Sequence, residues 1–265
     1  MSTYVMSDIH GCYDSFLQML SKIAFSDADQ LILAGDYIDR GPDSYQMLKW
    51  MEHCPDNVHL LRGNHEEEFA EAVDLMLEFD QRERLNSDFV SNRDAAALYR
   101  TVKYFFKKES LPAKYFDFYE TIYQLLRDYS ATLRDLSRWA AQIREMPYYR
   151  KLQIGEKPCV VVHGGYAENP EEIGDAFESL EEFYLYAREE SCELGGVRHG
   201  MVIAGHTPTI ACWEFAYNRG NVFRYYDADK DCVFYDIDCG CAYRAQDPNG
   251  KLACIRLEDE WIFYV

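Results

Sequence analysis

Acidic, histidine and arginine residues follow short apolar runs at several points of this sequence. Residues 31–34 are apolar and are followed by Gly35-Asp36-Tyr37-Ile38-Asp39-Arg40-Gly41. An apolar run bounded by glycine is typical of a buried strand, so the two acids and the arginine are expected in the loop at its C-terminal end. Buried charges without a compensating partner cost several kcal/mol each. We therefore expect Asp36 to face a cation.

The same arrangement recurs elsewhere in the chain. Further apolar runs end in Asp8-Ile9-His10-Gly11, Arg62-Gly63-Asn64-His65, His163-Gly164-Gly165 and Gly205-His206. Successive strand–loop–helix units bring such loops to one edge of a sheet, where α/β proteins bind ligands. Oxygen and imidazole groups without thiolates suit two divalent transition ions, namely Mn²⁺, Fe²⁺ or Zn²⁺, and one carboxylate has to bridge them. The candidate ligands are Asp8, His10, Asp36 as the bridge, Asn64, His163 and His206.

The elements that position these loops are short strands and helices. Strands are expected at residues 4–7, 30–34, 58–61, 159–162 and 201–204. Asp14 is expected to cap a helix with apolar residues at 16, 17, 20 and 23, and a second helix is expected from Asp43 to His53. Glu66, Glu67 and Glu68 are interpreted as helix-starting acids that favour the helix dipole.

A long helical insertion is expected between the third and fourth strands. Residues 67–146 contain no glycine, and Pro112 and Pro147 mark breaks within and after them. We expect one domain, residues 1–265, with 67–146 inserted into it, covering the site and selecting substrates. The apolar residues at helical spacing are Ala70, Val73, Leu77, Leu98, Val102, Phe105, Phe106, Phe116, Tyr119, Ile122, Tyr123 and Leu126.

The C-terminal part of the chain alternates between apolar and polar residues. Strands are expected at residues 233–235, 252–255 and 261–263, as one antiparallel segment. The stretch Asp247-Pro248-Asn249-Gly250 is typical of a turn and favours a hairpin there.

Composition and charge exclude several classes of protein. The chain has 265 residues, 48% of them hydrophobic, which is enough for a full core. Its formal charge of −19 repels phosphate backbones, so nucleic acid is not an expected partner. The chain contains no apolar stretch of membrane-spanning length and no room for a signal peptide before the first strand, so a cytoplasmic location without membrane contact is expected. The nine cysteines are interpreted as reduced, with Cys239-Gly240-Cys241 as a metal arm the weaker alternative.

Taken together, these motifs resemble the calcineurin-like metallophosphoesterases. Within them, the chain is similar to the phosphoprotein phosphatase branch, which includes serine/threonine phosphatases and bacterial diadenosine tetraphosphate hydrolases. The resemblance implies an α/β fold in which a two-sheet β sandwich is flanked by helices. It also implies two divalent metal ions, with Mn²⁺ the first choice. Asp8, His10 and Asp36 would hold the first ion, and Asp36, Asn64, His163 and His206 the second.

The resemblance also implies catalytic and substrate-binding roles. His65, oriented by Asp39, would face the leaving-group oxygen, while Arg40, Asn64 and Arg188 would bind phosphate oxygens. The match at Arg188 is looser, because Tyr186 stands where bacterial members usually have Trp. The chemistry agrees with these roles, since arginine offers a planar donor fork to a phosphoryl group and a carboxylate-paired histidine can supply a proton near pH 7.

Other interpretations of single residues stay open. Asp39 could hold Arg40 in a surface ion pair. His163 or His206 could be a core histidine, and Arg188 could be an ordinary helix-surface arginine.

Three functions are consistent with the whole pattern. The first is a phosphomonoesterase acting on phosphoserine or phosphothreonine by attack of a metal-bridging hydroxide. The second is a hydrolase of dinucleoside polyphosphates or another nucleotide. The third is a catalytically silent regulatory module that binds a partner, which the presence of both His65 and Asp39 disfavours. The oligomeric state is not predicted by any of these patterns.

Overall fold

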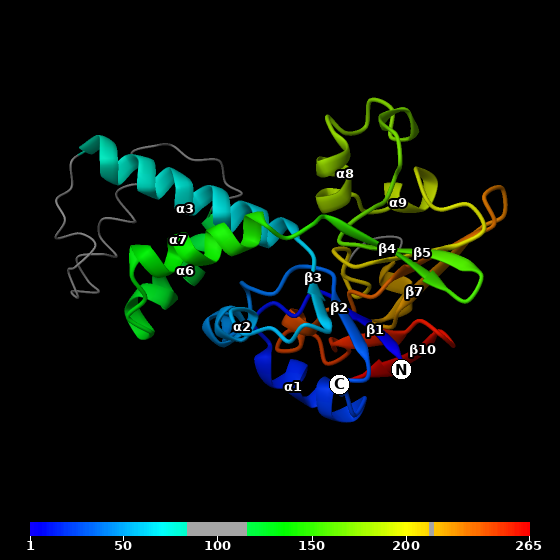
Figure 1. Ribbon diagram of the computed structural model, residues 1–265, viewed down its shortest axis with the longest axis horizontal. Coiled ribbons are helices and arrows are strands. Elements are labelled where there is room, and N and C mark those ends of the chain that lie inside the picture. The colour runs from blue at the N-terminus through cyan, green and yellow to red at the C-terminus, as the bar shows by residue number, and fades with distance from the viewer. Residues whose placement is uncertain (84–115, 212–214) are drawn as a thin grey trace.

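The computed structural model describes residues 1–83, 116–211 and 215–265, and their strands form two five-stranded sheets (Figure 1). In the first sheet the strand order is β10-β9-β1-β2-β3, with β1, β2 and β3 parallel. In the second sheet the order is β4-β5-β6-β8-β7, with β5, β6 and β8 parallel. The strands are β1 (Thr3–Met6), β2 (Gln30–Leu33), β3 (Val58–Leu60), β4 (Tyr149–Ile154), β5 (Lys157–Val162), β6 (Met201–Ala204), β7 (Phe223–Asp227), β8 (Cys232–Asp236), β9 (Ala253–Arg256) and β10 (Trp261–Tyr264).

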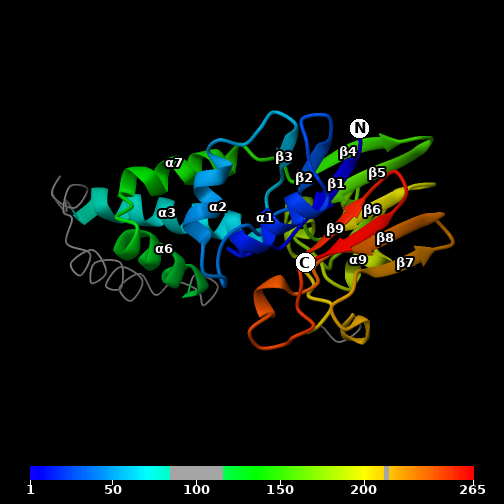
Figure 2. The ribbon, with the colours of Figure 1, turned by 90° about the horizontal axis from the view of Figure 1, so that it is seen from below.

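Successive residues of a strand point to opposite faces of its sheet, so each sheet can present an apolar face to the other. The two sheets pack together through these faces. Val5 and Ile32 of the first sheet meet Val161 and Ile203 of the second in one buried cluster. The alternate residues of the first sheet pack outward against α1 and α2, and those of the second pack against α8. The predicted two-sheet sandwich flanked by helices is confirmed, and the central strands are buried on both faces (Figure 2).

Helices cover the outer faces of both sheets and also form a separate group on one side of the first (Figures 1 and 2). That group contains α3, α6 and α7, which lie in the predicted insertion apart from the first turn of α3. Leu98, Val102, Phe105 and Phe106 of that insertion lie outside the described residues. The helices are α1 (Tyr13–Lys22), α2 (Ser44–Met51), α3 (Asn64–Glu83), α6 (Phe116–Asp128), α7 (Leu133–Arg144), α8 (Leu180–Tyr186) and α9 (Glu190–Glu193).

Hydrogen bonds join α7, the last helix of this group, to segments that follow β3 and α2. The buried Arg62 guanidinium, just after β3, donates to the main-chain carbonyls of Arg144 and Met146 at the end of α7. The indole of Trp139 on α7 donates to Glu52 Oε1 at 2.6 Å, at the end of α2. The exit of the insertion is therefore held against the short segment between β3 and α3, directly before Asn64 and His65. Its predicted role in covering the site and selecting substrates stays a prediction.

Three details differ from the sequence-based expectations. The α1 helix is capped at Cys12, and Asp14 lies within its first turn. Strands β4 and β7 were not predicted, since both are partly polar edge strands without a strong apolar run. The predicted hairpin at residues 247–250 is wrong, because β8 before the turn and β9 after it belong to different sheets. Turn residues specify a local chain reversal, whereas strand partners are chosen by long-range packing.

Candidate metal centre

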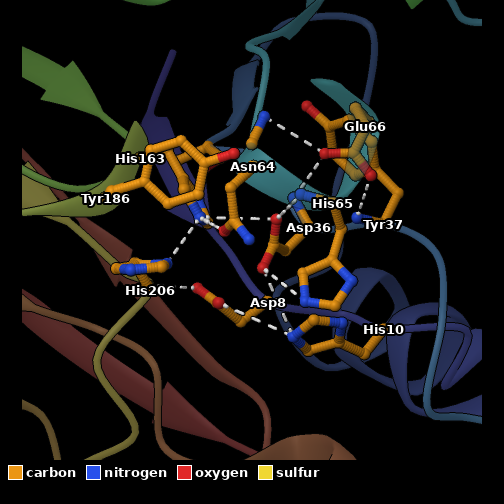
Figure 3. Close-up of polar contacts among 12 residues, drawn as sticks. Asp8, His10, Asp36, Tyr37, Asn64, His65, Glu66, His163, Tyr186 and His206 are labelled. Carbon is orange, nitrogen blue, oxygen red and sulfur yellow. Dashed lines mark hydrogen bonds and ion pairs between the residues drawn. The ribbon is translucent and has the colours of Figure 1, made fainter. Parts of the chain in front are cut away.

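The predicted ligands converge where the parallel strands of both sheets end (Figure 3). Three loops after β1, β2 and β3 come from the first sheet, and two loops after β5 and β6 come from the second. All six side chains are buried, although each is polar. They are Asp8, His10, Asp36, Asn64, His163 and His206.

The backbone of these loops is strained, and the loops approach one another closely. Asp8, Asp36 and His206 have φ values of 52°, 56° and 70°, in the left-handed region that costs a side-chain-bearing residue about 1–3 kcal/mol. The loops approach so closely that a Cβ atom on Gly63 would lie 2.3 Å from Asp36 Oδ1, and one on Gly205 would lie 2.1 Å from Asp8 Oδ2. A side chain at either glycine would collide with a carboxylate of the site, so both positions favour glycine.

One cluster is centred on His163. Its Nδ1 donates to the Ala34 carbonyl at 2.9 Å, so the proton lies on Nδ1 and Nε2 carries a lone pair. That Nε2 atom lies 3.0 Å from Asn64 Oδ1, 3.2 Å from His206 Nδ1 and 3.3 Å from Asp36 Oδ1. Lone pairs from several atoms thus point at one small volume. A cation placed among them would relieve the repulsion, which is the behaviour of a metal site.

A second cluster lies on the other side of Asp36. His10 Nδ1 donates to the Ile38 carbonyl at 2.9 Å, which leaves the Nε2 lone pair facing Asp36 Oδ2 at 3.4 Å and Asp8 Oδ1 at 3.9 Å. Arg40 Nη1 donates to the same His10 Nε2 at 2.9 Å. Asp36 therefore contacts both clusters, one carboxylate oxygen toward each.

The electrostatics also favour a bound cation. Burial is the main cause that raises the pKa of Asp36, and the neighbouring Asp8 carboxylate adds to the shift. Burial likewise lowers the pKa of His10 and His206, so both rings are neutral ligand donors. Among the described residues, Asp8 Oδ1 and His206 Nε2 are buried without a hydrogen-bond partner. Buried polar atoms are normally paired, so these donor groups fit divalent metal ions.

His65 and Asp39 form a buried pair beside the clusters. His65 Nδ1 lies 2.7 Å from Asp39 Oδ2, and its Nε2 lies 3.8 Å from Asp36 Oδ2. Burial lowers the pKa of His65, and the Arg40 guanidinium adds to the effect. By distance alone, His10, Asp36 and His65 form one group able to hold an ion, and Asp36, His163 and His206 form another. Geometry therefore leaves His65 able to act as a ligand or as a proton donor.

Arg188 reaches the site from the segment after α8. Its Nη1 donates to the main-chain carbonyl of His206 at 3.2 Å. The neighbouring Tyr186 donates its hydroxyl to Glu68 Oε1 on α3 at 2.9 Å, and its ring lies edge-on to His206 with centroids 6.3 Å apart. The end of α8 and the start of α3 are thus joined next to the clusters.

The interpretation of Glu66 as a helix-starting acid misses its main contacts. Glu66 is fully buried, and its carboxylate accepts hydrogen bonds from the backbone amides of Asp36, Tyr37 and Gly63 at 2.7, 2.8 and 3.1 Å. It therefore holds the loop after β2 against the loop after β3. In the sequence, its position directly after Asn64 and His65 could have indicated that Glu66 belongs to the site.

Asp238 is a second functional candidate that the sequence analysis missed. It follows β8, is 2% exposed, and accepts a hydrogen bond from Gly240 N at 2.9 Å. Burial raises its pKa, and the Asp8 carboxylate adds to the shift. The signal was its position after a predicted strand, as for the other site residues.

Comparison with known proteins agrees with this geometry. Residues 1–218 match the family model described as calcineurin-like phosphoesterase. The chain is 39% identical over 99 residues to the symmetrical bis(5'-nucleosyl)-tetraphosphatase of Buchnera aphidicola subsp. Acyrthosiphon pisum (strain Tuc7), which is 37% of this chain and 36% of that protein. The alignment thus spans about a third of the relative's length.

Two solved structures share the fold. A candidate diadenosine tetraphosphatase aligns with a TM-score of 0.54 at 16% identity, covering 100% of this chain and 92% of the other. A serine/threonine phosphatase from Saccharomyces cerevisiae, similar to human PP5, aligns with a TM-score of 0.53 at 13% identity, covering 100% of this chain and 79% of the other. At these identities, the likeness supports the fold.

The fold, the paired donor clusters and the family match define the class, which is that of the metal-dependent phosphoester hydrolases. The chain belongs to the calcineurin-like phosphoesterase family. In the described part of the chain, no helix combines the length and apolar character needed to cross a bilayer.

Proposed function

We propose that this protein is a two-metal phosphoesterase that hydrolyses dinucleoside polyphosphates at an anhydride bond. The convergence of Asn64, His206 and Asp36 on the lone pair of His163 Nε2 carries the metal-dependent chemistry. The relatives named bis(5'-nucleosyl)-tetraphosphatases support the substrate class.

The ligand roles follow from the two clusters. Asp8, His10 and Asp36 would hold one ion, and Asp36, Asn64, His163 and His206 would hold the other, with Mn²⁺ the first candidate. When bound, two such ions supply an activated water as nucleophile and Lewis-acid stabilisation of phosphoryl charge. Through its three backbone contacts, Glu66 holds the loop of Asp36 against Gly63, the residue before Asn64.

Charged side chains around the clusters bind and orient the substrate. Arg40 is hydrogen-bonded to His10, and Arg188 is hydrogen-bonded to the main-chain carbonyl of His206. Their guanidinium groups, together with the amide of Asn64, bind the phosphoryl oxygens and hold the phosphorus in line for attack. A planar guanidinium group suits this task, because its two parallel N–H groups fix the orientation of the phosphoryl group and also balance its negative charge.

His65 protonates the leaving oxygen in this proposal. Asp39 accepts from His65 Nδ1 and holds the ring in place. Burial and the Arg40 guanidinium lower the pKa of His65, and in this proposal Asp39 offsets them by stabilising the imidazolium form from which Nε2 delivers a proton. A serine or threonine alkoxide needs this proton more than a nucleotide phosphate does. The His65–Asp39 pair therefore favours phosphoserine and phosphothreonine as a second substrate candidate.

A substrate panel tests the proposal. The metal-free chain is loaded with Mn²⁺, and kcat/KM is measured for diadenosine tetraphosphate, a phosphoserine peptide and p-nitrophenyl phosphate. We expect metal-dependent turnover, highest for the dinucleotide, and its loss in Asp36→Asn. The matched control is Asp14→Asn, which makes the same change at an exposed position on α1.

Each outcome decides between the candidates. A preference for the phosphopeptide would replace the dinucleotide with the second candidate. Absence of turnover on every substrate with any of Mn²⁺, Fe²⁺ or Zn²⁺ would favour a binding module and overturn the proposal.

A further inference from the structure

Two of the three candidate histidine ligands are oriented by hydrogen bonds to main-chain carbonyls. His10 Nδ1 donates to the Ile38 carbonyl and His163 Nδ1 donates to the Ala34 carbonyl, each at 2.9 Å. In His206, Nδ1 faces His163 Nε2 at 3.2 Å, and the buried Nε2 atom has no hydrogen-bond partner among the described residues. A ligating imidazole commonly donates its second N–H to a carboxylate or a carbonyl, which fixes the ring. The ring of His206 therefore has to be oriented in another way.

Tyr186, the last residue of α8, packs against the ring of His206. The two rings are nearly perpendicular, with centroids 6.3 Å apart and an angle of 89° between their planes (Figure 3). Rings in this T-shaped arrangement attract each other, so Tyr186 favours one orientation of the imidazole. Two residues later, Arg188 Nη1 donates to the main-chain carbonyl of His206 at 3.2 Å. Residues 186–188 thus contact both the ring and the main chain of His206.

The ring of Tyr186 is itself held by α3. Its hydroxyl donates to Glu68 Oε1 at 2.9 Å, and Glu68 is buried. Glu68 lies four residues after Asn64 on α3, so the two side chains are on the same face of the helix, one turn apart. Tyr186 therefore connects two candidate ligands of one ion, Asn64 through α3 and His206 through its ring.

The main chain around Tyr186 is held against the loop that contains His163. Gly164 N donates to the Tyr184 carbonyl at 2.7 Å. The approach is so close that a Cβ atom on Gly164 would lie 3.0 Å from Ala187 N. The end of α8 is thus fixed relative to the loop after β5, which makes the Tyr186 side chain a firm support for a neighbouring ring.

We propose that Tyr186 is a positioning residue for the second metal ion, the one assigned to Asp36, Asn64, His163 and His206. Its ring keeps His206 Nδ1 directed at the ion, and its hydrogen bond to Glu68 keeps the ring in place. This role rests on the proposed two-metal function, but the binding of the ion can be measured without turnover. Tyr186 takes no part in bond breaking, because its hydroxyl donates to Glu68.

The size of the effect follows from what each substitution removes. Loss of a group that orients a metal ligand typically weakens metal binding by about 10- to 100-fold. Tyr186→Leu removes both the aromatic ring and the hydrogen bond, so we expect a loss of about 10- to 100-fold in affinity for the second Mn²⁺. Tyr186→Phe keeps the ring and loses only the hydrogen bond, so we expect a loss of about two- to tenfold.

Titration of the metal-free chain with Mn²⁺ measures these effects. Calorimetry gives the affinities of the two ions, and the electron paramagnetic resonance signal of two coupled Mn²⁺ ions shows when both are bound. The matched control is Tyr184→Phe, a buried tyrosine of the same helix whose hydroxyl donates to the Ala167 carbonyl at 3.0 Å. This variant loses a hydrogen bond of similar length that involves neither Glu68 nor His206. We expect it to bind both ions like the wild type.

Two substitutions of Glu68 separate the hydrogen bond from the charge. Glu68→Gln keeps an oxygen that can accept from the Tyr186 hydroxyl, whereas Glu68→Leu keeps none. We expect Glu68→Gln to bind the second ion nearly as the wild type does and Glu68→Leu to resemble Tyr186→Phe. The double variant Tyr186→Phe with Glu68→Leu should be no weaker than either single variant, because both remove the same bond.

The other outcomes count against the proposal. Unchanged binding of the second ion by Tyr186→Leu would overturn it, and so would an equal loss in Tyr184→Phe, which would indicate a general loosening of α8. Equal losses in Glu68→Gln and Glu68→Leu would assign the effect to the charge and overturn the role of the hydrogen bond. If Tyr186→Leu fails to fold, Tyr186→Phe and the double variant decide. A wild type that binds two ions but hydrolyses none of the three substrates would refute the proposed function alone, because the binding curves would still decide the role of Tyr186.

Discussion

Replacing Glu66 with Gln tests whether one carboxylate holds the site loops together. The carboxylate accepts from the amides of Asp36, Tyr37 and Gly63, and glutamine keeps only one acceptor oxygen. One buried N–H then faces an NH₂ group, which costs about 1–3 kcal/mol, and the remaining bonds lose their charge assistance, which costs about 1 kcal/mol more. We expect the free energy of unfolding of the metal-free chain to fall by about 2–4 kcal/mol.

Urea denaturation is the assay for this prediction. Burial raises the pKa of Glu66 to about 7, so the measurement is made near pH 8, where the carboxylate is ionised. The control is Glu78→Gln, the same change at an exposed position on α3, which should stay within about 0.5 kcal/mol of wild type. Turnover by Glu66→Gln should also fall, since Asp36 and Gly63 are no longer held. Equal stability of the two variants would refute the reasoning.

Three further predictions follow from the site and its supports. His65→Asn should slow hydrolysis of alkyl phosphates by about 10²–10⁴-fold and of p-nitrophenyl phosphate much less, and equal losses would exclude His65 as the proton donor. Mn²⁺ at about a thousand times its Kd should add about 4 kcal/mol to the free energy of unfolding of wild type and little to that of Asp36→Asn. Equal gains in the two proteins would place the ion elsewhere. Arg62→Met removes the donor to the Arg144 and Met146 carbonyls and should cost about 2–4 kcal/mol in urea denaturation, and an unchanged midpoint would refute that role.

The sequence was most informative where the chemistry is local. The apolar runs before Asp8, Asp36, His163 and His206 are strands in the structure, and the polar residues after them do converge. Strand periodicity and side-chain type are readable from neighbouring residues, so the strands and the candidate ligands could be predicted, whereas the two-sheet sandwich was implied by the family resemblance. The edge strands β4 and β7 escaped prediction because half-polar edge strands lack a continuous apolar signal.

Long-range partners were the part that the sequence could not supply. Nothing in the residues around Glu66 says that its carboxylate meets the amides of Asp36 and Tyr37 in the loop after β2, because those contacts require β2 and β3 to be paired in register. The assignment of β8 and β9 to different sheets depends in the same way on which faces the core covers.

The sequence by itself determined which side chains could bind metal ions and phosphate, and the strand ends from which they come. Only the tertiary structure decided that Asp36 lies between two donor clusters and that Glu66 holds the loop of Asp36 in place. The physical reason is that composition and periodicity are properties of neighbouring residues, whereas lone pairs converge on one volume only after two separate sheets have packed together.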